Sequence, residues 1–200
     1  MEIFLETERM VLRQCTADDV DRLVELHNDP DVMRYLGPCE ETAEHVRDEV
    51  LPRWLRLYAG GYGYWAAIEK AARPQAVEAP TGEFLGWFLF RPPMVDPEPG
   101  VVELGYRLHV AAWGRGFATE GANALVDKGF AEMGVQRVVA DTMTVNEGSQ
   151  RVMRKAGLRY VRTVFLRHTH PIDGSEHGDV EYALTREQWS AGPSAATPPR

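Results

Sequence analysis

A glycine-rich turn between a strand pattern and a helix pattern constrains this chain of 200 residues more than any other feature. Residues 101–110 are apolar, β-branched or aromatic at most positions, which predicts a strand. After Gly116, apolar residues recur at steps of three and four, which predicts one buried face of an amphipathic helix. The residues that carry this helical pattern are Ala118, Ala122, Leu125, Val126, Gly129, Phe130 and Met133.

The backbone of this turn is suited to binding an anion. Glycine at positions 114 and 116 lets a ligand approach the backbone closely, and the first N–H groups of the helix have no partner within it. They also lie at the positive end of the helix dipole, so we expect a phosphate or diphosphate to bind here. The expected contacts come from Gly114, Arg115, Gly116, Phe117, Ala118 and Thr119, with Arg115 adding a cation. The alternative is that the two glycines only make a tight turn.

A second strand and helix follow the first pair. Residues 137–143 read as a strand, and residues 146–157 as a helix with Asn146 as its N-cap and Gly157 just past its end. Two such units in succession, the first with an anion-binding opening, resemble the GCN5-related N-acetyltransferase (GNAT) superfamily. Within it the chain looks most like the branch of the ribosomal-protein N-terminal alanine acetyltransferases. The resemblance covers residue 7 to about residue 189.

The acyl-CoA signature of that superfamily is Gln/Arg-x-x-Gly-x-Gly/Ala, and it falls on residues 113–118. Trp113 stands where Gln or Arg is usual, a departure often seen in this branch. The resemblance implies an α/β protein with the GNAT fold. That fold has a mixed central sheet of about seven strands, a splayed parallel pair and about four helices. It also implies acetyl-CoA as the co-substrate, with no metal.

Further contacts with coenzyme A are expected where the two parallel strands diverge. The resemblance implies that they diverge at a bulged point near residues 108–111, and that the pantetheine arm pairs there like an extra strand. A backbone N–H near Val110 would stabilise the oxyanion of the thioester. The residues assigned to these contacts are Leu108, His109, Val110, Asn146 and Ser149.

Two residues are predicted to move protons. Glu103, on the strand facing the acceptor, is the candidate general base, and His109 is the alternative. Many members of the superfamily use a tyrosine to protonate the departing thiolate, but Met153 stands at that position here. The resemblance implies Ser149 as the donor instead, because the resembled branch commonly has a serine three residues after this asparagine. The simpler interpretations are a solvated or capping carboxylate at Glu103 and a serine that only satisfies the first turn of its helix.

The remaining elements follow from periodicity and turn residues. We expect strands at residues 8–14, 63–68, 82–90, 160–169 and 179–184, and helices at residues 16–27 and 42–58. Pro52 should kink the second of these helices, because proline removes a donor and clashes with the preceding turn. Residues 71–80 should form an exposed loop.

The amino-acid composition limits the number of domains, the location and the partners that we expect. A hydrophobic content of 44% is enough for one core, so we expect a single domain at residues 1–189 and a disordered tail at residues 190–200. An acidic N-terminus and the absence of a long apolar run predict a cytoplasmic protein that does not bind membranes. The net charge of −8 argues against nucleic acid as a partner. Cys15 and Cys39 are expected to be reduced thiols.

These observations predict an enzyme that transfers acetyl from acetyl-CoA to a primary amine, either a protein N-terminus or a small molecule. Attack should be direct, in a ternary complex, because no Cys or Ser lies in an activated setting. One alternative keeps the mechanism but uses another donor, such as succinyl-CoA, or an antibiotic-like acceptor. Another is a regulatory protein that binds acyl-CoA without turnover. The resemblance also allows a homodimer. The histidines and acids at positions 168, 170, 173, 177 and 179 match no standard metal site.

Overall fold

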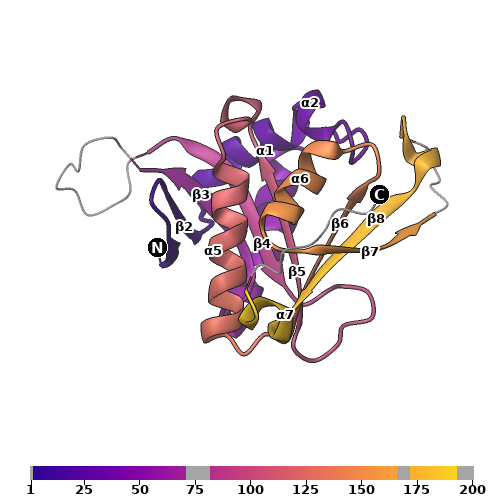
Figure 1. The fold of residues 1–200 in the computed structure, drawn as a ribbon. Coiled ribbons are helices and arrows are strands. Elements are labelled where there is room, and N and C mark those ends of the chain that lie inside the picture. The colour runs from indigo at the N-terminus through magenta and orange to yellow at the C-terminus, as the bar shows by residue number, and fades with distance from the viewer. Residues whose placement is uncertain (1, 71–81, 166–171, 193–200) are drawn as a thin grey trace.

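The computed structural model describes residues 2–70, 82–165 and 172–192. Its centre is an eight-stranded mixed sheet with helices on both faces, in the order β1-β2-β3-β4-β5-β6-β8-β7 (Figure 1). Only β5 and β6 pair in parallel within this sheet of the described residues. The strands are β1 (Ile3–Glu6), β2 (Met10–Gln14), β3 (Gly63–Glu69), β4 (Phe84–Arg91), β5 (Val101–Leu108), β6 (Arg137–Met143), β7 (Arg159–Val164) and β8 (Asp179–Thr185).

This architecture confirms the predicted α/β fold with a parallel pair. All seven expected strands are present, and β1 is an additional one. Its four residues form a hairpin with β2, and the run is too short for periodicity to distinguish it from a loop.

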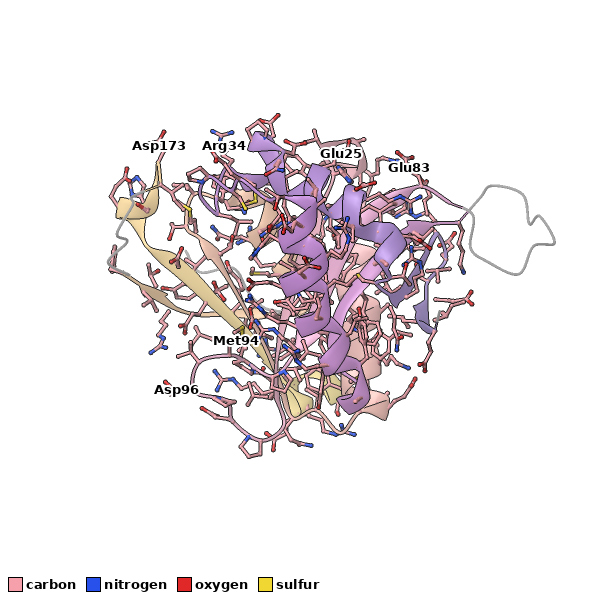
Figure 2. The ribbon with its side chains drawn as sticks, turned by 180° about the vertical axis from the view of Figure 1, so that it is seen from behind. Glu25, Arg34, Glu83, Met94, Asp96 and Asp173 are labelled. Carbon is pink, nitrogen blue, oxygen red and sulfur yellow. The ribbon has the colours of Figure 1, made fainter. Side chains whose placement is uncertain are left out.

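The helices divide between the two faces of the sheet. Helices α5 (Phe117–Glu132) and α6 (Glu147–Lys155) cover one face, and the helices formed by residues 17–60 cover the other (Figures 1 and 2). This second group comprises α1 (Val20–Asn28), α2 (Pro30–Met33), α3 (Ala43–His45) and α4 (Leu51–Leu57), and the short α7 (Arg186–Ser190) follows β8. The short helices α2 and α7 add to the four expected helical regions.

Pro52 interrupts its helical region in a specific way. Between α3 and α4, residues Val46–Val50 form one π-helical turn, in which the N–H of Leu51 bonds to the carbonyl of Val46. Such a wider turn is a usual way to accommodate a disturbed helical ladder. The predicted irregularity is therefore present, and it lies in the turn that precedes the proline.

The central strand β4 contributes side chains to two hydrophobic cores, one on each face of the sheet. Phe88 and Phe90 pack under α5, whereas Trp87 and Leu89 pack under α1 and α4. Successive side chains of a strand point to opposite faces, so a strand covered on both faces must be apolar throughout.

Helix α5 lies unusually close to this strand because two of its residues are glycines. A methyl group at Gly129 would lie 2.6 Å from the Phe90 ring, and one at Gly121 would collide with the Phe88 ring. We expect Gly121→Val to lower the free energy of unfolding by about 1–3 kcal/mol, because overpacking a filled core costs that much. Urea unfolding measures it. Asn123→Val changes an exposed position of the same helix and should lower the free energy of unfolding by only about a few tenths of a kcal/mol. Equal losses in both variants would contradict this packing.

Several sequence expectations concern other parts of the chain. Both cysteines are free, with Cys15 buried and Cys39 partly exposed. No helix in the described part of the chain has the length and hydrophobicity needed to cross a membrane. The loop expected at residues 71–80 lies outside the described residues, as do His168, His170 and residues 193–200 of the predicted tail. Ser190, predicted to begin that tail, still belongs to α7.

Candidate active site

The two parallel strands separate in the middle of the sheet. They pair only as Val101↔Arg137, Val102↔Val138 and Glu103↔Val139. Beyond this point β5 stays with β4 up to Leu108, and β6 stays with β8 up to Met143. The divergence predicted near residues 108–111 is therefore wrong in position, because the strands already separate after Glu103. Each strand follows its antiparallel neighbour, and an opening forms between the two halves of the sheet.

Backbone groups of β5 face this opening. The N–H of His109 donates to the carbonyl of Leu85 at 2.9 Å and so points toward β4. Because N–H groups alternate along a strand, those of Tyr106 and Leu108 point the other way, into the opening. The carbonyl of Leu108 accepts a bond of 2.8 Å from the indole N–H of Trp113. Trp113 thus ties the glycine turn to the end of β5, a role that its sequence position did not reveal.

The glycine turn has the predicted backbone conformation. Gly114 and Gly116 have φ angles of 70° and 88°, a region that other residues rarely adopt. The N–H of Glu120 bonds to the carbonyl of Gly116 at 3.0 Å and is the first of the helical ladder. The N–H groups of residues 117–119 therefore have no helical partner, at the start of a helix of 16 residues. This is an arrangement that can bind phosphate.

Two arginines lie beside the turn. Arg115 pairs with Glu69 at 2.5 Å, whereas Arg9 pairs with Glu120 at 2.6 Å and donates to the carbonyl of Arg115 at 2.8 Å. Their guanidinium groups lie 4.7 and 4.5 Å from the centre of the Phe117 ring. Arg9 was missed at the sequence level, because it lies far from the turn along the chain and carries no motif. Both positive charges are held at the mouth of the turn.

Helix α6 is fixed to β6 by its first residues. The side chain of Asn146 accepts a bond of 3.1 Å from the N–H of Ser149 and donates one of 3.1 Å to the hydroxyl of Thr142. The predicted N-cap is confirmed. This bonding holds the Ser149 hydroxyl at the first turn of the helix.

A tyrosine reaches Ser149 across the opening. The phenol of Tyr106, on β5, donates to the Ser149 hydroxyl at 3.1 Å. Burial raises the pKa of Tyr106 to about 12, although the bond to Ser149 lowers it, so the phenol keeps its proton at neutral pH. Met153, at the position where the resemblance expects a tyrosine, is 4% exposed and belongs to the core. Sequence reasoning missed Tyr106, whose only signal is its alternation with Leu104 and Leu108.

Glu103 lies on the opposite face of β5. Its carboxylate pairs with Arg91 at 3.2 Å, and its side chain is 27% exposed whereas that of Arg91 is 8% exposed. Burial raises the pKa of the Glu103 carboxyl, Arg91 opposes this change, and Asp141 adds to it. A carboxyl group with a raised pKa is suited to accept a proton near neutral pH.

The acceptor face of the sheet is partly uncovered. The helices of residues 17–60 leave β7 and β8 bare, and the loop that carries Met94 and Asp96 borders the bare region (Figure 2). A hollow of about 220 Å³ lies there, with Val101, Val139 and Asp141 in its wall. Val101 and Val139 are neighbours of Glu103 in the sheet, although Glu103 itself does not line the hollow.

His109 lies apart from these groups. Its ring meets the edge of Phe84 at a centroid distance of 5.9 Å, and it lines a second hollow with Arg22 and Glu25. The opening thus brings together Tyr106, Ser149 and the turn on α5, with Glu103 on the acceptor face and His109 at the far end of β5.

Comparison with known proteins agrees with this geometry. Residues 9–159 match the family model of the acetyltransferase (GNAT) domain. The chain belongs to the GNAT family. It is 32% identical over 193 residues to the FsC-acetyl coenzyme A-N(2)-transacetylase of Aspergillus fumigatus. This alignment covers 92% of this chain and 77% of the relative. This GNAT chain is therefore an N-acetyltransferase.

Solved structures show the same fold. A GNAT acetyltransferase from Bacillus anthracis superposes with a TM-score of 0.71 at 23% identity, covering 94% of this chain and 99% of that one. An aminoglycoside acetyltransferase, AAC(6')-Ib, in complex with coenzyme A has a TM-score of 0.67 at 21% identity, covering 92% of this chain and 99% of that one.

Proposed function

We propose that this GNAT enzyme transfers acetyl from acetyl-CoA to a primary amine by direct attack in a ternary complex. The observation that carries the proposal is the opening between β5 and β6. The glycine turn lies at one end of it, the hydroxyls of Ser149 and Tyr106 meet across it, and Glu103 lies where it begins, on the opposite face of β5. The diphosphate of coenzyme A fits the turn, and its pantetheine arm fits the free edge of β5.

In this proposal the amine nitrogen bonds to the thioester carbonyl carbon, and the carbon–sulfur bond then breaks. The amine proton passes to Glu103, directly or through water. The departing thiolate takes a proton from Ser149, which Tyr106 replenishes through their hydrogen bond. The N–H groups of Tyr106 and Leu108 are candidates to stabilise the oxyanion, together with the predicted N–H near Val110.

The proton relay makes its own prediction. Tyr106→Phe should lower kcat by roughly tenfold to a hundredfold without weakening acetyl-CoA binding, because general acid catalysis contributes at least that much. Steady-state kinetics and calorimetric titration with acetyl-CoA measure the two quantities. Tyr160→Phe is the matched control, since this exposed tyrosine of β7 bonds only to Thr163 among described residues. An unchanged kcat in Tyr106→Phe would contradict the relay, because Ser149 would then donate its proton without resupply from Tyr106.

The nature of the acceptor is supported less directly. The name of the Aspergillus relative specifies acetyl coenzyme A and a nitrogen acceptor, and the name of the similar structure specifies an aminoglycoside. Both favour acetyl as the acyl group and a small-molecule amine over a protein N-terminus. Assignment to the ribosomal-protein branch rests on Trp113, Asn146 and Ser149. The homodimer rests on the same resemblance, whereas the cytoplasmic location stays a prediction from composition.

Thiol release from acetyl-CoA tests the function. The purified protein would be assayed with amino acids, polyamines, aminoglycosides and peptides as acceptors, and succinyl-CoA would compete as an alternative donor. Release with at least one class of amine supports the proposal. Tight binding of acetyl-CoA without release for any acceptor would favour the regulatory alternative instead.

A further inference from the structure

Among the residues that the structure describes, none forms an ion pair with the half-buried Arg107. It lies on β5, where it shares the acceptor face with Glu103 because alternate residues of a strand point the same way. Its Nε is buried and has no hydrogen-bond partner. Within the described residues, its guanidinium group makes no ion pair within 4.0 Å.

The two fully buried arginines of the described residues, Arg13 and Arg91, are both paired. Arg13 makes two bonds to Asp19, of 2.6 and 2.7 Å, and Arg91 pairs with Glu103 at 3.2 Å. Buried charges are normally paired, because removing them from water is costly. Burial lowers the pKa of Arg107, although Cys39, Tyr64 and Glu41 oppose this change. Arginine nevertheless stays charged in proteins.

Glu41 is the carboxylate whose charge acts on Arg107, and its own contacts are with two histidines. Glu41 faces the Nδ1 of His27 at 3.5 Å and the Nε2 of His45 at 3.6 Å. Two hydrogen bonds of 2.7 Å between Asn28 and the backbone of Glu41 hold this segment in place. The charge of Glu41 favours that of Arg107, but among the described residues no ion pair within 4.0 Å joins the two side chains.

Trp87 and His27, which also lie near Arg107, are held in place by a hydrogen bond. The guanidinium of Arg107 lies 5.1 Å from the centre of the Trp87 ring, and the indole N–H of Trp87 donates to His27 Nε2 at 3.1 Å. Burial lowers the pKa of His27 to about 4, and the charge of Arg107 contributes, so the imidazole is neutral at pH 7. Within the described residues, Arg107 is thus a positive charge that no carboxylate contacts directly, although Glu41 acts on it from farther away.

This arginine also lies beside the reaction. Its chain neighbours Tyr106 and Leu108 point their N–H groups into the opening, where the thioester is proposed to bind. The side chain of Arg107 leaves the strand at that point, on the face that it shares with Glu103.

We propose that Arg107 binds a carboxylate of the acceptor, so that the substrate is an amine that also carries a carboxylate, such as an amino acid or its derivative. A guanidinium group presents parallel N–H donors that match the two oxygens of a carboxylate. Such a ligand would provide the partner that Nε and the terminal nitrogens lack. The inference rests on the proposed function, because it places the acceptor beside the thioester.

Matched acceptors test the inference. Amino acids would be compared with the amines that remain after loss of the carboxylate, for example L-lysine with cadaverine and L-phenylalanine with phenethylamine. We expect kcat/KM in thiol release to favour the carboxylate member by about tenfold or more. Arg107→Gln should remove this preference by raising KM for the carboxylate member alone, and Arg107→Lys should retain part of it. Calorimetric titration of the coenzyme A complex gives the same comparison for binding.

Controls separate the possible failures. Arg56→Gln makes the same change of charge at an exposed position of α4 and should leave the preference intact. Thermal unfolding and coenzyme A binding establish that each variant is folded. Equal binding and turnover of both members of every pair by the unmodified enzyme would overturn the role of Arg107. An absence of thiol release with every acceptor would instead overturn the proposed function.

Discussion

Replacing Glu103 by glutamine is expected to lower kcat by about a hundredfold or more, while the dissociation constant for acetyl-CoA stays unchanged. Glutamine keeps the shape of the side chain but cannot accept the proton of the attacking amine. The carboxylate lies on the acceptor face, away from the turn that is proposed to bind coenzyme A. Steady-state kinetics with saturating acetyl-CoA, together with calorimetric titration, would separate the two quantities.

The pH dependence of kcat/KM gives an independent check on Glu103. A base must be deprotonated, so activity should rise with pH through the pKa of this carboxyl, which burial raises above its ordinary value. Asp141 raises it further, so Asp141→Asn should move the rising limb to lower pH and preserve the plateau. Glu103→Gln should remove this limb.

The opposite result would reassign the base. A full rate in Glu103→Gln, with a large loss in Asp141→Asn, would identify Asp141 as the proton acceptor. Thermal unfolding of both variants is needed, because removing the Glu103 charge leaves Arg91 buried without its partner.

Replacing Gly114 by alanine is expected to weaken coenzyme A binding by about tenfold or more, because a methyl group would hold the diphosphate away from the backbone N–H groups. Gly134, at the other end of α5, is a matched control. The two glycines have φ angles of 70° and 71°, and neither would bring an added Cβ within 4 Å of another group. Both variants should therefore lose the same stability, about 1–2 kcal/mol for a left-handed alanine.

Only the Gly114 variant should lose affinity. Calorimetric titration with coenzyme A and urea unfolding measure the two effects on the same samples. Equal affinities in the two variants would mean that this turn does not contact the diphosphate, and the proposed site would have to be abandoned.

Local patterns in the sequence were enough to predict the strand, turn and helix units. Periodicity gave β5, α5, β6 and α6, and single residues marked their ends, as Asn146 does for α6. Gly114 and Gly116 indicated a turn that needs the conformational freedom of glycine, and their φ angles of 70° and 88° agree with this. These features depend on neighbours in the chain, so the sequence alone determined them.

Tertiary structure alone decided how the site is assembled. The separation of β5 from β6 after Glu103 depends on the pairing of each strand with its other neighbour. The contact of Tyr106 with Ser149 and that of Arg9 with the turn join residues far apart in the chain. The unpaired guanidinium of Arg107 depends on what surrounds it in space. Side-chain partners of this kind have no sequence period, because the fold of the whole sheet brings them together.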